Sequence, residues 1–190
     1  MDITQLLQAA NEGEPEALDQ LAPLVYDELR WMAHRQMSQE HRPRTLSTTG
    51  LVHEAYLKLV SGPNLPSENR RHFYAAASRA MRQIMVNEAR RRNAEKRGGK
   101  AEHLLLDSTE IGFNAVSSEI LSLDEALNRL EAVDQRLAQV VECRFFGGLT
   151  VDETAEAVTC SSRTVKRDWR LARAWLYNEM GGAGAEPMQE

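Results

Sequence analysis

Cationic side chains recur at helical spacing in residues 161–176, which read SSRTVKRDWRLARAWL. In a helical projection the apolar residues of this stretch fall on one side: Val165, Trp169, Ala172 and Leu176. The cations fall on the other side: Arg163, Lys166, Arg167, Arg170 and Arg173. Guanidinium and ammonium groups in this density bind phosphates well. The spacing therefore predicts a helix with one buried side and one side that contacts a polyanion.

A second, shorter helix is predicted at about residues 151–158, just before the cationic one. Thr150 and Glu153 form a capping box at its start, and Ser161 is a candidate N-cap for the following helix. Ala155 provides the small side chain that two crossing helices need, and the turn 159–161 is short. Together these features predict a helix-turn-helix, whose second helix can enter the major groove of DNA. A helical hairpin in an unrelated bundle is the alternative interpretation.

A third predicted helix, residues 67–92, with Ser67 as its N-cap, is also basic on one side. Its apolar sector contains Phe73, Ala76, Ala77, Ala80 and Ile84. Its arginines fall roughly opposite, with Val86 intruding among them: Arg71, Arg79, Arg82 and Arg90. Guanidinium groups at this density repel one another unless phosphates or acids lie near. An ordinary solvated face is the alternative interpretation.

The charge is segregated along the chain. The 190 residues carry a net charge of −5, yet residues 68–100 hold ten Arg or Lys against three acids. Residues 161–176 hold five against one, so the remaining segments together carry −16. A protein that binds polyanions without sequence preference is usually basic throughout. Two basic islands on an acidic chain instead indicate two anion-contacting faces.

Other chemistries find no support in the sequence. His53 and Glu54 begin a zinc-protease H-E-x-x-H pattern, but the second histidine position is Leu57, so that ligand is missing. Cys143 and Cys160 lack metal-binding or redox spacing, and buried or incidental thiols are expected. We predict no enzyme, no cofactor and no metal site. The acidic N-terminus and the short apolar runs predict a cytoplasmic protein without a membrane span.

The elements that position these residues are predicted to be helices throughout. The expected order is 3–37, broken at Gly13 and bent or restarted near Pro23, then 51–60, then 67–92. Residues 93–121 show no sustained periodicity and contain a glycine pair, so a flexible linker with at most a short helical turn is predicted. A helix is then expected from the capping box at residues 122–125 to about residue 131. The next helix is closed by Gly147 and Gly148, and the tail 181–190 is expected to be disordered.

The order and spacing of these parts resemble an extracytoplasmic-function sigma factor of bacterial RNA polymerase. The segments that carry the resemblance are LVHEAYLKLV, HFYAAASRAMRQIMVNEARRR and RLAQVVECRFFGGLTVDETAEAVTCSSRTVKRDWRLARAWL. The resemblance implies an all-α chain of two small helical domains joined by a flexible linker. Residues 1–92 would bind core polymerase and melt the minus-ten element, and residues 122–180 would read the minus-thirty-five element by a helix-turn-helix. Residues 93–121 would be the linker and 181–190 a disordered tail.

The resemblance also implies individual site residues. Six positions match the polymerase-binding helix: Leu51, Val52, Glu54, Ala55, Tyr56 and Leu59. The positions that match minus-ten recognition and melting are Phe73, Arg79, Arg82, Gln83, Asn87 and Arg90. The groove-facing positions of the recognition helix are Ser162, Arg163, Lys166, Arg167 and Arg170. Residues 61–69 match a loop that receives a flipped base in the family.

The chain departs from the family pattern at three places. Ala76 stands where the family usually has a tryptophan, and Thr159 stands at the common turn glycine. The acidic run that usually precedes the polymerase-binding helix is replaced by Ser47, Thr48 and Thr49, with no acid between residues 40 and 54. Because a phosphoryl group adds about −1.5 to −2 charge, a Ser/Thr kinase acting there could restore the missing charge. Simple N-capping is the alternative role of these hydroxyls.

The implied partners are RNA polymerase core enzyme and promoter DNA, with an anti-sigma factor or a Ser/Thr kinase as candidate regulators. A stand-alone helix-turn-helix repressor or activator is the main alternative function. A helical adaptor that binds only proteins is the third interpretation. The three differ in how they bind DNA: a dimeric repressor binds a palindromic duplex alone, a sigma factor needs core enzyme for specificity, and an adaptor has no salt-dependent affinity for DNA.

Overall fold

A computed structural model describes residues 3–37, 47–60, 70–98 and 108–180, and in these residues the chain is helical without strands. The prediction of an all-α fold is confirmed. The N-terminal helices are α1 (Ile3–Asn11), α2 (Pro15–Met37), α3 (Thr48–Val60) and α4 (Arg70–Gly98). The C-terminal elements are α5 (Ser108–Val133), α6 (Gln135–Val141), the π-helical segment η1 (Glu142–Phe146), α7 (Val151–Ala157) and α8 (Ser162–Glu179).

Helix α1 packs on α2, α2 on α3, and α3 on α4, and side chains of all four helices share one core. The break predicted at Gly13 is present: this residue has a φ of +86°, a backbone conformation that glycine adopts without the penalty of a Cβ. Helix α2 runs on through Pro23 without restarting. Buried leucines of α1 and α2 meet Phe73, Tyr74 and Met81 of α4 in one core. Burial of this apolar surface is the main force that holds the N-terminal helices together.

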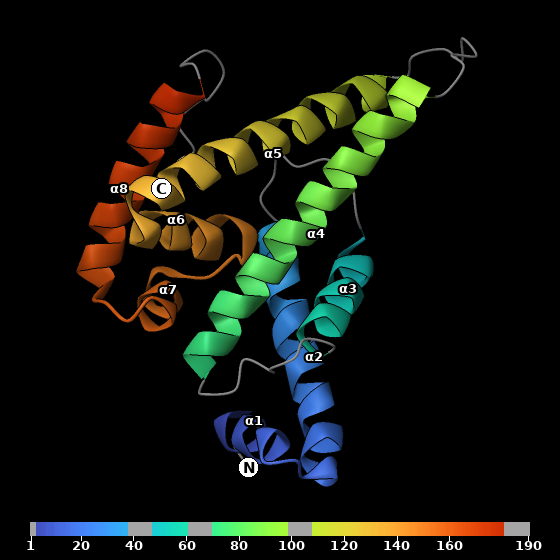
Figure 1. Cartoon of the computed structure of the whole chain (residues 1–190), viewed down its shortest axis with the longest axis vertical. Coiled ribbons are helices and arrows are strands. Elements are labelled where there is room, and N and C mark those ends of the chain that lie inside the picture. Colours follow the sequence, from blue (N-terminus) through green and yellow to red (C-terminus); the bar gives the residue numbers. More distant parts are fainter. Residues whose placement is uncertain (1–2, 38–46, 61–69, 99–107, 181–190) are drawn as a thin grey trace.

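Helix α4 lies between the N-terminal helices and the C-terminal elements (Figure 1). Its far side is covered by α5, η1 and α7. Val86 and Ala89 are buried against Ile120 of α5, so α4 has apolar contacts on two sides. A helix that is apolar on two sides packs between two layers. Of the arginines on α4, Arg82 is buried between these layers, whereas Arg71, Arg79 and Arg90 are exposed.

The C-terminal elements form their own core, which joins the first one. Leu123, Leu127 and Leu130 of α5 pack against Ala172 and Leu176 of α8. The π-helical segment η1 contributes to both cores, since its Cys143 belongs to the N-terminal core and its Phe146 to the C-terminal one. Burial raises the pKa of the Cys143 thiol to about 12, which makes it unreactive.

The predicted irregular linker over residues 93–121 differs from the structure. Helix α4 continues to Gly98, and α5 already begins at Ser108, which leaves residues 99–107 outside the described part of the chain. Ser122 and Glu125 lie inside α5, so their capping-box pattern does not start a helix there. The helix persists because Ile120, Leu123 and Leu127 recur at helical spacing and are buried. The predicted tail, 181–190, lies outside the described residues, as does Ser67.

The caps predicted for the last two helices are confirmed. Thr150 accepts a hydrogen bond from the backbone N–H of Glu153, and the Glu153 side chain accepts one from the Thr150 N–H. Ser161 accepts from the backbone N–H of Thr164 at the start of α8. Each such cap contributes about 1 kcal/mol to helix stability. Helices α7 and α8 are thus joined by a short connection, which ends at the N-cap of α8.

Candidate nucleic-acid interface

Helix α8 exposes a row of cations to solvent. The side chains of Arg163, Lys166, Arg167 and Arg170 are all exposed, and we call these four residues the α8 basic face. None of Arg163, Lys166 and Arg170 forms an ion pair with any residue in the described ranges. The opposite side of the helix is buried in the C-terminal core. The sequence projection of this helix therefore matches its burial pattern.

The start of α8 is fixed against α7. The hydroxyl of Ser162, a predicted groove-facing residue, is half-buried and donates a hydrogen bond to Asp152 of α7. Thr159, in the connection, has a φ of +55°. This left-handed conformation is unfavourable for a β-branched residue and explains why a glycine is common at the matching turn position. The connection thus holds the N-terminal end of α8 in one place at some local cost.

Arg167 differs from the other members of the α8 basic face because it has a carboxylate partner. Its Nε and Nη2 both donate to Oδ1 of Asp168, at 3.0 and 2.8 Å. Asp168 is fully buried, and its Oδ2 accepts from Nε of Arg136 at 2.7 Å. The hydrogen bond to Asp168 and the negative charge of that carboxylate raise the pKa of the Arg136 guanidinium above its ordinary value.

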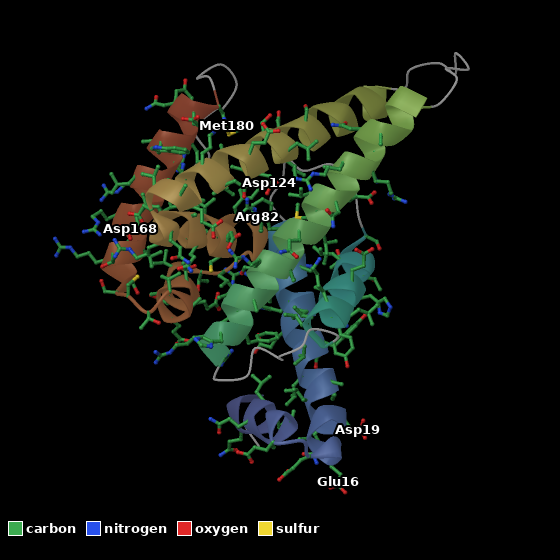
Figure 2. The ribbon with its side chains drawn as sticks, in the orientation of Figure 1. Glu16, Asp19, Arg82, Asp124, Asp168 and Met180 are labelled. Carbon is green, nitrogen blue, oxygen red and sulfur yellow. The ribbon has the colours of Figure 1, made fainter. Side chains whose placement is uncertain are left out.

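The basic side of α4 meets acids of the C-terminal elements. Arg82 lies within 2.7 Å of both Asp124 of α5 and Glu142 of η1, and it also donates to Asn128. Figure 2 shows Arg82 and Asp124 next to one another between the two helices. Arg82 and its two ion-pair partners, Asp124 and Glu142, are buried. Burial lowers the pKa of Arg82, but the hydrogen bonds to Glu142 and Asp124 outweigh it and the pKa lies above its ordinary value.

Two further arginines of α4 are paired at the edge of this contact. Arg79 is exposed but donates to Glu131 at 2.8 Å, and Arg90 donates to Asp124 at 3.3 Å. We call Asp124, Glu131 and Glu142 the acidic cover of α4. Because the acidic cover already supplies negative charge to these arginines, they differ electrostatically from the α8 basic face.

The other predicted minus-ten residues fall into two groups. Gln83 and Asn87 are exposed one turn apart on α4, where both amides face solvent. Phe73 is 1% exposed and lies in the N-terminal core against the buried leucines. In this arrangement neither Phe73 nor Arg82 is accessible to solvent, because tertiary contacts bury the apolar ring and the paired guanidinium. A DNA contact from either residue therefore stays a prediction that requires its surroundings to move.

Helix α3 presents only part of the predicted polymerase-binding set. Leu51, Val52, Ala55 and Leu59 are all buried in the N-terminal core, so their side chains hold α3 in place and do not lie on its surface. Tyr56 is half-buried and packs edge-on against Tyr26, with ring centroids 6.4 Å apart.

The solvent side of α3 carries residues that a partner protein can reach. Glu54 is exposed, and Leu57 is an exposed apolar residue, at 48% of its maximal area. Sequence reasoning used Leu57 only to exclude zinc. Its position off the apolar stripe was the signal that it faces outward.

The hydroxyl-rich segment before α3 has one clear structural role. Ser47 Oγ accepts a hydrogen bond from the backbone N–H of Gly50 at 3.0 Å, and the Ser47 carbonyl accepts from Leu51. Ser47 is therefore the N-cap of α3. Thr48 is half-buried and Thr49 is exposed, and the first turn of the helix contains no acid. Thr49 is therefore more accessible than Thr48.

Sequence reasoning missed Asp124, Glu142 and Asp168 as determinants of the basic faces. Asp124 and Glu142 are 42 and 60 residues away from Arg82, so no local pattern links them to it. Asp168 does carry a local signal, because it is the only acid among the cations of residues 161–176 and projects toward the apolar side. A charged residue on a buried side is expected to have a charged partner.

Comparison with known proteins gives one match. The family model described as ECF sigma factor matches residues 1–182. No curated protein and no solved structure matches the chain. None of the described helices combines the length and the apolar composition that crossing a bilayer requires.

Proposed function

The chain belongs to the family of ECF sigma factors, which direct RNA polymerase to promoters, and we propose that its helix α8 reads the minus-thirty-five element as duplex DNA. The observation that carries this proposal is the α8 basic face, where three of four cations have no ion-pair partner among the described residues. A capped helix that follows a short turn can place its N-terminal residues in the major groove. Arginine there can bind guanine with two hydrogen bonds, and lysine can bind phosphates.

Helix α4 recognises the minus-ten element in this proposal, mainly through its exposed residues. Gln83 and Asn87 are exposed and can offer both donors and acceptors to an unpaired base. Arg79 and Arg90 are exposed at the edge and can exchange the acidic cover for phosphates. A contact from Arg82 requires the acidic cover to separate from α4, since the guanidinium is only 6% exposed. Residues 1–92 and 122–180 thus remain the proposed functional halves.

The proposed role of Gln83 and Asn87 has a direct test. With core enzyme and a promoter, the Gln83→Ala/Asn87→Ala variant should form closed complexes as the parent does but open them poorly. Permanganate reactivity of unpaired thymines reports the opening. Undiminished reactivity in the double variant would contradict the role.

Polymerase binding is assigned to the solvent side of α3, with Glu54 and Leu57 as contact residues. In the first turn of α3 a phosphoryl group on Thr49, or second on Thr48, would supply a negative charge that this turn lacks. It would also lie near the positive end of the helix dipole. A Ser/Thr kinase is therefore the proposed regulator of polymerase binding, with an anti-sigma factor as the alternative regulator.

The phosphorylation proposal is tested by core-polymerase affinity. The unmodified chain, kinase-treated chain, a Thr48→Ala/Thr49→Ala variant and a Thr48→Asp/Thr49→Asp variant are compared. Kinase treatment should tighten binding in the parent and have no effect in the alanine variant. Tight binding by the unmodified chain that kinase treatment leaves unchanged would leave these hydroxyls with a capping role only.

The rival function, a stand-alone helix-turn-helix regulator, makes a different prediction on DNA. A sigma factor should protect promoter DNA specifically only when core enzyme is present, whereas a dimeric repressor should protect a palindromic duplex by itself. Footprinting of the same promoter fragment with the chain alone, core alone and both together separates the two. Specific protection by the chain alone would overturn the proposed function.

A further inference from the structure

Asp168 is a buried carboxylate on the helix that carries the α8 basic face. It lies between Val165 and Ala172 on the inward side of α8 and is fully buried. Moving a carboxylate out of water is costly unless charged partners and hydrogen bonds replace the lost hydration. An apolar residue of similar size would fill this position at lower cost. The charge at this position therefore has a reason other than packing.

The two carboxylate oxygens of Asp168 accept hydrogen bonds from two different arginines. Oδ2 accepts from Arg136, which lies in the first turn of α6. Oδ1 accepts from Nε and Nη2 of Arg167, the neighbouring residue on α8. The Arg136 contact anchors the carboxylate to a separate helix, and the anchored carboxylate then holds one edge of the Arg167 guanidinium. Asp168 thus links the C-terminal core to a side chain that is exposed to solvent.

This contact leaves the outer edge of Arg167 available. Nε and one N–H of Nη2 are occupied by Asp168, whereas the second N–H of Nη2 and the Nη1 group donate to no described residue. A guanidinium can present that second edge to the two acceptors of guanine in the major groove. Arg163 and Arg170 have no such partner, and each must lose the freedom of a long side chain when it binds.

We propose that Asp168 is a positioning residue that orients Arg167 for base recognition and so sets the sequence discrimination of the helix. The proposal deepens, and rests on, the assignment of α8 to the minus-thirty-five element. An oriented guanidinium discriminates between base edges better than an unrestrained one, which also binds phosphates, and phosphates carry no sequence information. Asp168 also offsets one of two arginine charges, which keeps sequence-independent phosphate binding low.

The test uses Asp168→Asn, which is nearly isosteric, together with Arg167→Ala and the double variant. Full-length chain with core enzyme is measured on promoters in which each minus-thirty-five base pair is changed in turn. Arg167→Ala should lose discrimination at one or two base pairs by about tenfold or more. Asp168→Asn should lose it at the same base pairs, while binding to unrelated duplex stays equal or rises. The double variant should be no worse than Arg167→Ala alone.

Arg136→Gln provides the comparison variant, because it removes the anchor to α6 and leaves Asp168 in contact with Arg167, so discrimination should fall less than in Asp168→Asn. A purely structural role predicts that Asp168→Asn and Arg136→Gln both lower the melting temperature and weaken all promoters equally. That outcome would overturn the proposal while α8 keeps its role in DNA reading. If Arg167→Ala and Arg163→Ala both leave discrimination intact, the assignment of α8 itself fails.

A measurement on the unaltered chain covers the case in which Asp168→Asn does not fold. Nitrogen-15 relaxation of the arginine side chains reports how rigid each Nε–H group is. Arg167 should be markedly more ordered than Arg163 and Arg170, which lie on the same helix and serve as internal controls. Equal mobility of the three guanidinium groups would overturn the proposal without any variant.

Discussion

Helices α4 and α8 both carry arginines along one side, yet the two sides lie in opposite surroundings. On α4 the acidic cover forms ion pairs with Arg79, Arg82 and Arg90, and Arg82 is buried. On α8 three of the four cations of the basic face have no described ion-pair partner. The comparison shows that a basic helical face does not by itself indicate DNA contact. Its arginines are available for DNA only where no acid from elsewhere in the chain pairs with them.

The two helices also use buried charge differently. Around Arg82 one cation is shared between two carboxylates, and around Asp168 one carboxylate is shared between two arginines. A buried ion pair of this kind adds little net stability, but removing one partner is costly because the other is left charged and unsolvated. The first cluster joins α4 to α5 and η1, and the second joins α8 to α6.

Removing Arg82 should have the largest effect. Arg82→Ala leaves Asp124 and Glu142 buried without their cation, and we expect the free energy of unfolding to fall by about 3–5 kcal/mol. Chemical denaturation of the full chain measures it. Arg163→Ala on α8 is the matched control and should change stability by less than about 0.5 kcal/mol, because that side chain is exposed and unpaired among the described residues. Similar losses of unfolding free energy in both variants would contradict the claim that α4 has a buried, paired arginine and α8 an exposed, unpaired one.

Gly147 provides a steric way to displace η1, which carries Glu142 of the acidic cover. A Cβ added here would lie 2.8 Å from the Cys143 carbonyl oxygen and 2.9 Å from the Ser78 Cβ, besides colliding with the Ser78 hydroxyl. Gly147→Ala should therefore push η1 away from α4 and cost about 1–3 kcal/mol of stability. Adding Ser78→Gly removes the side chain on α4 that is in the way. If the double variant loses as much stability as the two single variants combined, the alanine at position 147 does not clash with Ser78.

Thr159→Gly should have the smallest effect and the opposite sign. At a φ of +55° a residue with a Cβ costs about 1–2 kcal/mol, and glycine avoids that cost. Part of the gain is lost because glycine gives the unfolded chain more conformational freedom. We expect stability to rise by about 0.5–1 kcal/mol, measured by thermal unfolding. The acidic cover lies outside this turn, so the loss caused by Arg82→Ala should be unchanged in the Thr159→Gly background. A destabilised single variant would mean that the threonine side chain makes up for its strained backbone.

Local patterns predicted some parts of the molecule well. The capping box at Thr150 and the N-cap at Ser161 depend only on residues within one turn, and both are present. The two sides of α8 could also be predicted, because this helix is buried on one side only. In each case the determining contacts lie close together in the sequence.

Other features depend on contacts between distant residues and escaped prediction. The projection of α4 assumed one buried side, but Val86 and Ala89 pack against Ile120 of α5. The interpretation of residues 93–121 as a linker concealed α5, because the glycine and the polar residues of 108–119 weaken the helical pattern before Ile120. Arg82 looked like a surface cation because nothing near it in the sequence indicates Glu142. Residue type and spacing specify a helix face, but they do not specify which other element covers it.

Promoter discrimination by the α8 basic face is the most direct test of the account. Run-off transcription with core enzyme is compared on promoters with intact and scrambled minus-thirty-five elements, using the parent, Arg163→Ala and Arg170→Ala. The account predicts that the parent prefers the intact promoter and that at least Arg163→Ala reduces this preference by about 1–3 kcal/mol, with core binding and stability unchanged. Variants that match the parent on both promoters would contradict the claim that α8 reads duplex DNA.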